Sequence, residues 1–385
     1  MERFLDPALF PYYLVALVWI SRARLALESL RVMPVIEPET AQHLASRPFV
    51  SIIVPAKNEE RNIQGCLASL LAQDYPHFEI IAVDDRSSDR TPSLLEDLRR
   101  QESSGRLVVI SNSLTAEKWT GKNFAVHTGA QKARGEWLLF TDADTRHEPQ
   151  ALSAVMKHAH ARDLKFLSLL PRCLTGSLLE DVVQATAMAF LGLWFPIKKI
   201  NDPKSKTYFA NGQYLLMERK LYDRINGHSE VREEFLEDFA LMKNSKQSGA
   251  RVECALGAKV YGTRMYDSFD SIWCGWRRIY LHAFRSQPGT LFFKCLGLIF
   301  FSVVPFIAFL FLLFSIGQDP DRYVFVCAVA AAVLLLILVT SWKAYSIVKA
   351  KKVFSVFHPV AALLLAMILL DASWMAATKQ PTKWR

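Results

Sequence analysis

A strand-like apolar segment that ends in two acidic residues constrains this chain more than any other feature. Residues 138–141 (Leu-Leu-Phe-Thr) are followed directly by Asp142, Ala143 and Asp144. Ligands of open α/β sheets bind at the carboxyl ends of the strands, so these two carboxylates are candidates for holding a divalent cation. Mg²⁺ is commonly held by one or two carboxylates together with phosphate oxygens. Taken alone, the same pattern also fits a solvated turn.

Alternating strand and helix patterns place this segment in an α/β domain. Apolar runs typical of buried strands lie at residues 50–54, 79–83, 107–110 and 138–141, and a later one lies at 214–217. Helical patterns lie between them, at residues 62–72, after Thr91-Pro92, and at residues 123–134. Such alternation is typical of a mostly parallel sheet with helices on both faces. We therefore predict an α/β fold whose first strands end in polar residues that face a nucleotide.

The C-terminal third is apolar enough to lie in a membrane. Residues 295–317 are uncharged and exceed the about 20 residues that a crossing needs, and residues 323–342 predict a return crossing. Residues 353–370 fit either a third crossing or a re-entrant hairpin, because Pro359 and Asp371 weaken the pattern. The lysines between residues 343 and 352 predict a cytoplasmic side.

The N-terminal residues predict a membrane anchor. Residues 7–20 are apolar and are followed by Arg22, Arg24 and Arg31, which favours a cytoplasmic end there. The run is short for a crossing, so a helix at the membrane interface is the alternative. Residues 178–200 likewise fit either a bilayer-facing segment or core. The predicted regions are an anchor at 1–30, a linker at 31–48, a cytoplasmic α/β domain at 49–285 and a transmembrane region at 290–378, in a multi-pass protein of the cytoplasmic membrane.

Charge and cysteine content exclude two classes of function. The net charge is +9, but many basic residues flank the apolar runs, which favours a membrane surface over nucleic acid as the partner. There is no basic stripe interleaved with aromatic residues, so no nucleic-acid partner is expected. The six cysteines contain no Cys-x-x-Cys pair, which argues against a zinc site or a disulfide framework.

Four stretches, in this order, resemble the membrane-bound family 2 glycosyltransferases. They are residues 51–59 (Ser-Ile-Ile-Val-Pro-Ala-Lys-Asn-Glu), 83–91 (Val-Asp-Asp-Arg-Ser-Ser-Asp-Arg-Thr), 141–144 (Thr-Asp-Ala-Asp) and 237–238 (Glu-Asp). The resemblance covers residues 49–280 and implies an inverting enzyme with a nucleotide-sugar-binding domain of the GT-A type. Residues 119–123 (Trp-Thr-Gly-Lys-Asn) are similar to the subgroup associated with hopanoid biosynthesis, which has carotenoid and glycolipid glycosyltransferases as close relatives.

The resemblance implies roles on the donor side of the site. The residues that would border the nucleotide are Pro55, Ala56, Asn58 and Glu59. Asp85, with Asp84 beside it, would accept hydrogen bonds from uracil or ribose. Lys122 would neutralise phosphate as a point charge. Asp144 would bind Mg²⁺ or Mn²⁺ through the diphosphate, with Asp142 directed toward the ribose and the metal.

On the acceptor side, the resemblance implies that Asp238 is the general base that removes the proton of a lipid hydroxyl. At a predicted helix start, the helix dipole is expected to keep this carboxylate ionised. Many family members carry Gln-x-x-Arg-Trp or Arg-x-x-Arg-Trp after the base, but here neither Arg277 nor Arg278 is followed by Trp. We still assign the diphosphate to these arginines and a stacking role on sugar or acceptor to Trp276. The departure disfavours a processive polysaccharide synthase.

Each motif also has a purely structural interpretation. Asp84-Asp85 fits a polar turn, Glu237-Asp238 fits helix N-terminal charge, and Lys122 alone fits a solvated lysine. The leading hypothesis is sugar transfer from a nucleotide sugar, with a UDP-sugar expected, to a membrane lipid. The alternatives are a polysaccharide synthase and a catalytically inactive nucleotide-sugar-binding scaffold. An inactive scaffold would have no chemical need for all four of the aspartates at positions 85, 142, 144 and 238, so their presence argues against that alternative.

Overall fold

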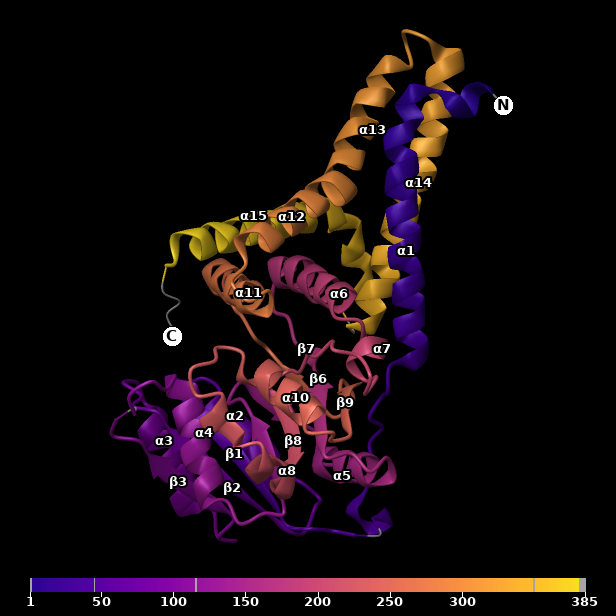
Figure 1. The fold of residues 1–385 in the computed structure, drawn as a ribbon. Coiled ribbons are helices and arrows are strands. Elements are labelled where there is room, and N and C mark those ends of the chain that lie inside the picture. The colour runs from indigo at the N-terminus through magenta and orange to yellow at the C-terminus, as the bar shows by residue number, and fades with distance from the viewer. Residues whose placement is uncertain (1, 45, 115, 349, 381–385) are drawn as a thin grey trace. The chain divides into compact units, whose positions relative to one another are not determined.

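The computed structural model describes all residues except 1, 45, 115, 349 and 381–385, and it divides them into two compact units. Residues 33–174 and 197–265 form an α/β unit. The described residues of 2–32, 175–196 and 266–380 form a helical unit. Figure 1 shows both, with the strands gathered in the α/β unit. The chain therefore leaves the α/β unit after residue 174, returns to it at residue 197 and leaves it again after residue 265.

A seven-stranded sheet forms the centre of the α/β unit, in the order β3-β2-β1-β4-β8-β6-β9. The strands are β1 (Val50–Ala56), β2 (Phe78–Asp84), β3 (Leu107–Ser111), β4 (Trp137–Thr141), β6 (Phe166–Leu170), β8 (Tyr214–Glu218) and β9 (Val252–Leu256). Strands β1 to β4 run parallel to one another, and β8 alone is antiparallel to both neighbours, β4 and β6. This confirms the prediction of a mostly parallel sheet.

Helices cover both faces of this sheet, as the sequence predicts. They are α2 (Ile63–Leu71), α3 (Thr91–Gln101), α4 (Gly121–Lys132), α5 (Ala151–Ala161), α7 (Ile197–Ile200), α8 (Arg219–Arg224), α9 (Gly227–Glu230) and α10 (Glu237–Gln247), with a 3-10 turn η3 (Ala41–His43). Ile80 of β2 packs into the larger core, together with residues of α2 and α5, whereas Ile81 packs with Ala125 of α4. Successive side chains of a strand point to opposite faces, so β2 is buried on both sides.

Two smaller features complete the α/β unit. A three-stranded sheet has the order β5-β10-β7, with β5 (Thr145–His147), β7 (Arg172–Cys173) and β10 (Tyr261–Thr263). The segment predicted as a linker packs against β9: the backbone N–H of Ile36 donates to the carbonyl of Leu256 at 2.9 Å, and Ile36 is buried. Strand β5 of the small sheet begins directly after the Asp142–Asp144 turn, and its pairing with β10 restrains the C-terminal end of that turn.

The helical unit contains long apolar helices. They are α1 (Phe10–Val32), α6 (Ala185–Trp194), α11 (Phe269–Ala283), α12 (Pro288–Leu298), α13 (Val304–Ser315), α14 (Pro320–Ile347) and α15 (His358–Thr378), with short turns η1 (Glu2–Leu5), η2 (Pro7–Leu9), η4 (Glu180–Gln184), η5 (Ile299–Val303) and η6 (Lys352–Phe357). Among the described residues, three helical stretches are long and apolar enough to cross a membrane: Pro288–Ser315, Pro320–Ile347 and Lys352–Thr378. The first two correspond to the two predicted crossings.

The third stretch is the one that the sequence left open. It is long enough to cross, although Asp371 lies within it. The Asp371 carboxylate accepts a hydrogen bond of 2.7 Å from Trp273 Nε1 and pairs with Arg277 Nη1 at 2.9 Å. An acidic group in an apolar helix is far less costly when it is paired and hydrogen-bonded. The charge that weakened the sequence pattern is therefore compensated by α11.

Candidate active site

The carboxyl ends of β1 and β2 bring the predicted nucleotide-binding residues together. Ala56 and Asp84 are paired in register, and the backbone N–H of Asp85 donates to the Ala56 carbonyl at 2.8 Å. Asp84 and Asp85 are both buried, and Pro55 is half-buried. Burial excludes the interpretation of Asp84-Asp85 as an exposed polar turn.

The loops that follow these two strands hold each other in place. Asn58 has a φ of 55°, a left-handed conformation that asparagine tolerates better than most residues. Its Oδ1 accepts from the backbone N–H of Ser88 at 2.9 Å, and its own N–H donates to Ser87 Oγ at 2.9 Å. The N–H of Glu59 donates to Thr91 Oγ1 at 2.8 Å. Asn58 and Glu59 therefore shape the loop at this edge of the sheet.

Asp85 lies against the first residue of α4. Its carboxylate contacts Arg86 Nε at 3.2 Å and Lys57 Nζ at 3.8 Å. A Cβ atom on Gly121 would lie only 2.5 Å from Asp85 Oδ2, so a larger residue there would displace the carboxylate. The Asp84 carboxylate accepts from the N–H of Ser87 at 3.3 Å, which also restrains this turn.

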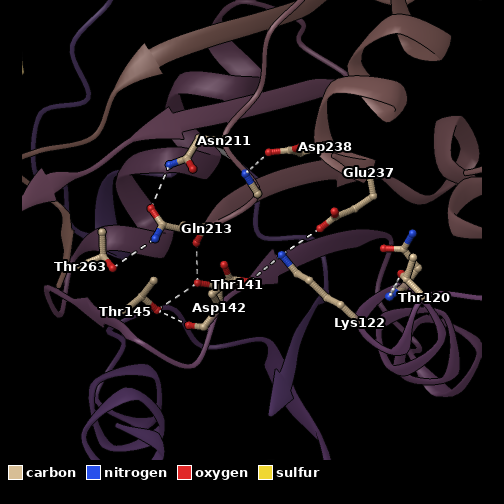
Figure 2. Close-up of polar contacts among 12 residues, drawn as sticks. Thr120, Lys122, Thr141, Asp142, Thr145, Asn211, Gln213, Glu237, Asp238 and Thr263 are labelled. Carbon is tan, nitrogen blue, oxygen red and sulfur yellow. Dashed lines mark hydrogen bonds and ion pairs between the residues drawn. The ribbon is translucent and has the colours of Figure 1, made fainter. Parts of the chain in front are cut away.

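Lys122, the second residue of α4, joins two acidic groups that are far apart in the sequence. Figure 2 shows its Nζ between Asp142, at 3.0 Å, and Glu237, at 2.8 Å. The lysine side chain is only 13% exposed, which excludes a solvated surface lysine. Burial opposes its charge, but the Asp142 and Glu237 carboxylates outweigh that effect and raise the pKa of Lys122.

Asp142 and Asp144 offer two hard oxygen ligands at the end of β4. Both are half-buried, so they are within reach of a ligand. This donor set fits Mg²⁺ or Mn²⁺, which accept carboxylate and phosphate oxygens. Over the described part of the chain, no group of three or more His, Cys, Asp or Glu side chains could hold a metal ion by itself. A cation here would thus need oxygens from a bound ligand.

A buried polar network supports the turn that carries Asp142. Thr145 Oγ1 donates to the Asp142 carbonyl at 2.7 Å, and Thr141 Oγ1 donates to the Gln213 carbonyl at 2.8 Å. Gln213 Nε2 donates to Thr263 Oγ1 at 3.2 Å (Figure 2). Residues 211 and 213 were not among the predicted site residues. Alternating polar residues at Asn211 and Gln213, just before an apolar strand, were the available signal.

Asp238 is the second residue of α10 and is 8% exposed. Its Oδ2 accepts from the N–H of Gly212 at 2.8 Å, and its Oδ1 accepts from the N–H of Phe239 at 2.8 Å. Burial raises the pKa of Asp238 to about 7; the neighbouring Glu237 carboxylate adds to the rise, whereas Lys122 and the two N–H groups oppose it. Burial opposes the ionisation that the helix dipole is expected to favour, so an ionised Asp238 stays a prediction.

Trp276, Arg277 and Arg278 all lie on α11 and belong to the helical unit. Trp276 is 2% exposed and stacks on Tyr280 with ring centroids 5.5 Å apart. Arg277 is paired with Asp371. The structure therefore groups these residues with the helices, and their assignment to the diphosphate and to a stacked sugar stays a prediction.

The sequence is similar to those of known proteins. Residues 51–225 match the family described as Glycosyl transferase family 2. The 4,4'-diaponeurosporenoate glycosyltransferase of Staphylococcus haemolyticus (strain JCSC1435) is 25% identical over 247 residues, covering 63% of this chain and 64% of that protein. The enzyme of the same name from Staphylococcus aureus (strain USA300) is 28% identical over 245 residues, covering 63% and 62%. The chain thus spans less than two thirds of the length of these relatives.

A solved structure extends the similarity to the fold. A mannosyltransferase from Pyrobaculum calidifontis, in complex with GDP-Man and Mn²⁺, superposes with a TM-score of 0.54 at 17% identity and covers 96% of each chain. At this identity the similarity concerns the fold alone. Together with the family match and the mostly parallel sheet, it confirms the resemblance found in the sequence. Residues 51–225 are a glycosyl transferase family 2 domain, within an α/β fold of the GT-A type.

Proposed function

We propose that this protein is an inverting glycosyltransferase that moves a sugar from a nucleotide-sugar donor, with a UDP-sugar expected, to a membrane lipid. One observation carries the proposal: Lys122 contacts both the Asp142 carboxylate of the donor-side motif and the Glu237 carboxylate next to the candidate base. These two ion pairs support the proposal that both halves of the predicted site act as one site. The relatives named for 4,4'-diaponeurosporenoate support a lipid acceptor.

On the donor side, Asp85 would accept hydrogen bonds from the nucleoside, and residues 55–59 would border it. Asp142 and Asp144 would hold the cation together with the diphosphate. A divalent cation, when bound, supplies Lewis-acid stabilisation of the leaving diphosphate. Lys122 adds a positive charge beside the same carboxylates, where it offsets the charge of the phosphates.

On the acceptor side, Asp238 would take the proton of the attacking hydroxyl. The oxygen then forms a bond to the anomeric carbon while the bond from that carbon to the diphosphate breaks on the opposite face, which inverts the centre. A base is most effective when its pKa lies near the working pH, and burial brings the pKa of Asp238 to about 7. The N–H groups of Gly212 and Phe239 orient its two oxygens.

The three long apolar helices support a location in the membrane. Because the lysines at 343–352 lie where the second stretch ends and the third begins, the positive-inside rule favours a multi-pass protein of the cytoplasmic membrane with its catalytic domain in the cytoplasm. We assign the acceptor to that membrane face.

The chemistry of the acceptor distinguishes two versions of this proposal. A hydroxyl must lose a proton as it attacks, and we assign that task to Asp238. An acid such as the diaponeurosporenoate of the relatives' name presents a carboxylate, which has no proton to lose at neutral pH. We favour the hydroxyl, because two backbone N–H groups orient the Asp238 carboxylate and burial raises its pKa, as suits a general base.

A panel of labelled nucleotide sugars tests the function. Membranes containing the protein are incubated with UDP-glucose, UDP-N-acetylglucosamine or GDP-mannose, and the lipids are extracted and separated. We expect one donor to label a single lipid-extractable product, and membranes with the Asp144→Asn variant to lose that product. Label in long polymers would instead indicate a polysaccharide synthase. Donor binding to the purified protein without transfer to any lipid would indicate the scaffold.

A further inference from the structure

The segment that delivers the candidate base contains neither helix nor strand. Residues 231–236 lie between the short helix α9 and the start of α10, and they form turns, a bend and irregular backbone. The position of Asp238 therefore depends on what holds this segment. The contacts that hold it come from the Trp119-Thr-Gly-Lys-Asn123 motif, at the start of α4.

Asn123 makes most of these contacts through one side-chain amide. Its Nδ2 donates to the backbone carbonyls of Val231 at 2.9 Å, Arg232 at 3.2 Å and Glu234 at 2.9 Å. Asn123 is only 1% exposed, so water does not replace these bonds readily. The backbone N–H of Thr120 adds a further bond to the Arg232 carbonyl at 3.0 Å.

The next contact along the segment is made by the neighbouring residue of α4. Lys122 pairs with Glu237 at 2.8 Å, directly before Asp238. The first turn of α4 is itself fixed, because Thr120 Oγ1 accepts from the N–H of Asn123 at 3.2 Å as the helix N-cap. Asn123 thus holds residues 231–234 of the segment, and the adjacent Lys122 holds Glu237, the residue that follows the segment.

We propose that Asn123 is a positioning residue for the Asp238 base, acting through the backbone of residues 231–234. This rests on the proposed function, in which Asp238 removes the acceptor proton. Among the residues that the structure describes, the hydrogen bonds of the Asn123 amide nitrogen go to the segment that leads into α10, not to the donor-side carboxylates. Its loss should therefore disturb the base more than the binding of the donor.

The expected effect is on turnover. A shift of about 1 Å in a catalytic group can lower the rate by about 100-fold. We expect Asn123→Ala to lower kcat by about 10- to 100-fold while the affinity for the donor changes less than about two-fold, because an interaction made only in the transition state is weakened. Asn123→Asp has the same size but no donor group, so it should be at least as severe as Asn123→Ala.

The matched control is Asn201→Ala. Asn201 also lies in the α/β unit, and its side chain makes two bonds to the backbone of Cys254 in β9, at 2.9 Å and 2.8 Å. It therefore reports the general effect of removing an asparagine that bridges backbone segments. We expect Asn201→Ala to lower thermal stability without the selective loss of kcat.

Hydrogen–deuterium exchange of the full-length protein in detergent gives a readout that needs no substrate. Asn123→Ala should speed exchange in the peptide covering residues 231–240, and Asn201→Ala should leave that peptide unchanged. Faster exchange there, with no transfer from any nucleotide sugar by the unaltered protein, would support the positioning contact but overturn the proposed function. Unchanged exchange in that peptide, or an Asn123→Asp variant with normal kcat, would overturn the inference even in an active enzyme.

Discussion

The carboxylate of Asp238 is held by the backbone of Gly212, whose N–H donates to Oδ2 at 2.8 Å. A Cβ atom on this glycine would lie 3.3 Å from the same oxygen, so the approach is close. Gly212 lies in the turn that enters β8, the strand next to β4 and its Asp142–Asp144 turn. This bond thus positions Asp238, the candidate base on α10, relative to the central sheet.

Two aspartate variants should separate chemistry from donor binding. A positioned general base contributes about 10²- to 10⁴-fold in rate, so Asp238→Asn should lower turnover by that factor with nearly unchanged donor affinity. Asp144→Asn should weaken metal-dependent donor binding as well as turnover. The measurements are calorimetric donor binding and initial rates for both variants. If Asp238→Asn keeps near-normal turnover, the base is Glu237 or the acceptor is a carboxylate.

The pH dependence should report the buried base. Because burial raises the pKa of Asp238 to about 7, kcat/KM should fall as the pH drops through that value. Glu237→Gln removes a negative charge that contributes to the rise, so its acid limb should move to lower pH. The profile of the Asp238→Asn variant should lack this limb. An acid limb that survives in Asp238→Asn would contradict the assignment.

The same shift has a consequence for stability, and its sign is fixed by linkage. The folded pKa lies above the usual value near 4, so the folded state holds this proton more tightly than the unfolded state does. Its contribution is fully present below about pH 4 and is lost as the pH rises through about 7. The Tm difference between the unaltered protein and Asp238→Asn should therefore change across this range.

Gly121→Ala should weaken nucleotide binding. The added Cβ would lie 2.5 Å from Asp85 Oδ2, so the carboxylate must move from the place where we expect it to meet the nucleoside. Gly192→Ala is the matched control, because a Cβ on Gly192 has no heavy atom within 4 Å. Calorimetry with UDP should show a higher Kd for Gly121→Ala alone. Equal affinity in both variants would argue against a contact between Asp85 and the nucleotide.

Transfer should require a divalent cation. Asp142 and Asp144 present two carboxylates, too few to hold a metal without a ligand, so excess chelator should abolish both transfer and tight donor binding. Mg²⁺ or Mn²⁺ added back should restore them. Full activity in excess chelator would remove the metal from the proposal.

The orientation in the membrane can be tested with native cysteines. Cys173 of the α/β unit is half-buried, Cys274 is exposed, and the other four are buried. In a Cys274→Ser variant, an impermeant thiol reagent should label Cys173 only after the membranes are opened. Labelling in intact cells would place the α/β unit outside the cytoplasm.

The sequence predicts the parallel half of the sheet well, for a clear physical reason. Strands β1, β2 and β4 are buried on both faces, so they appear as continuous apolar runs that end in polar residues. Strands β6 and β9 were missed; β9 contains the buried Glu253, which pairs with His158 and Arg162. Such pairing joins residues far apart in the chain, so it cannot be recognised from the local sequence.

The site divides in a similar way. The carboxylates at residues 84–85, 142–144 and 237–238 could be named from sequence, since their motifs are local. The contacts that connect them, Lys122 with Glu237 and Gly212 with Asp238, join residues far apart in the chain. The raised pKa of Asp238 was missed for the same reason, because burial is a property of the assembled fold.

Residues 175–196 belong to the helical unit although they lie between two parts of the α/β unit in the sequence. This arrangement limits how a water-soluble fragment of the protein can be made. A fragment cut from residues 33 to 265 would still contain α6, whose Ala187 and Phe190 are buried within the helical unit. Without the rest of that unit, these apolar side chains would face water and promote aggregation. A polar linker in place of residues 175–196, rather than truncation at the two ends alone, is therefore the modification that such a fragment needs.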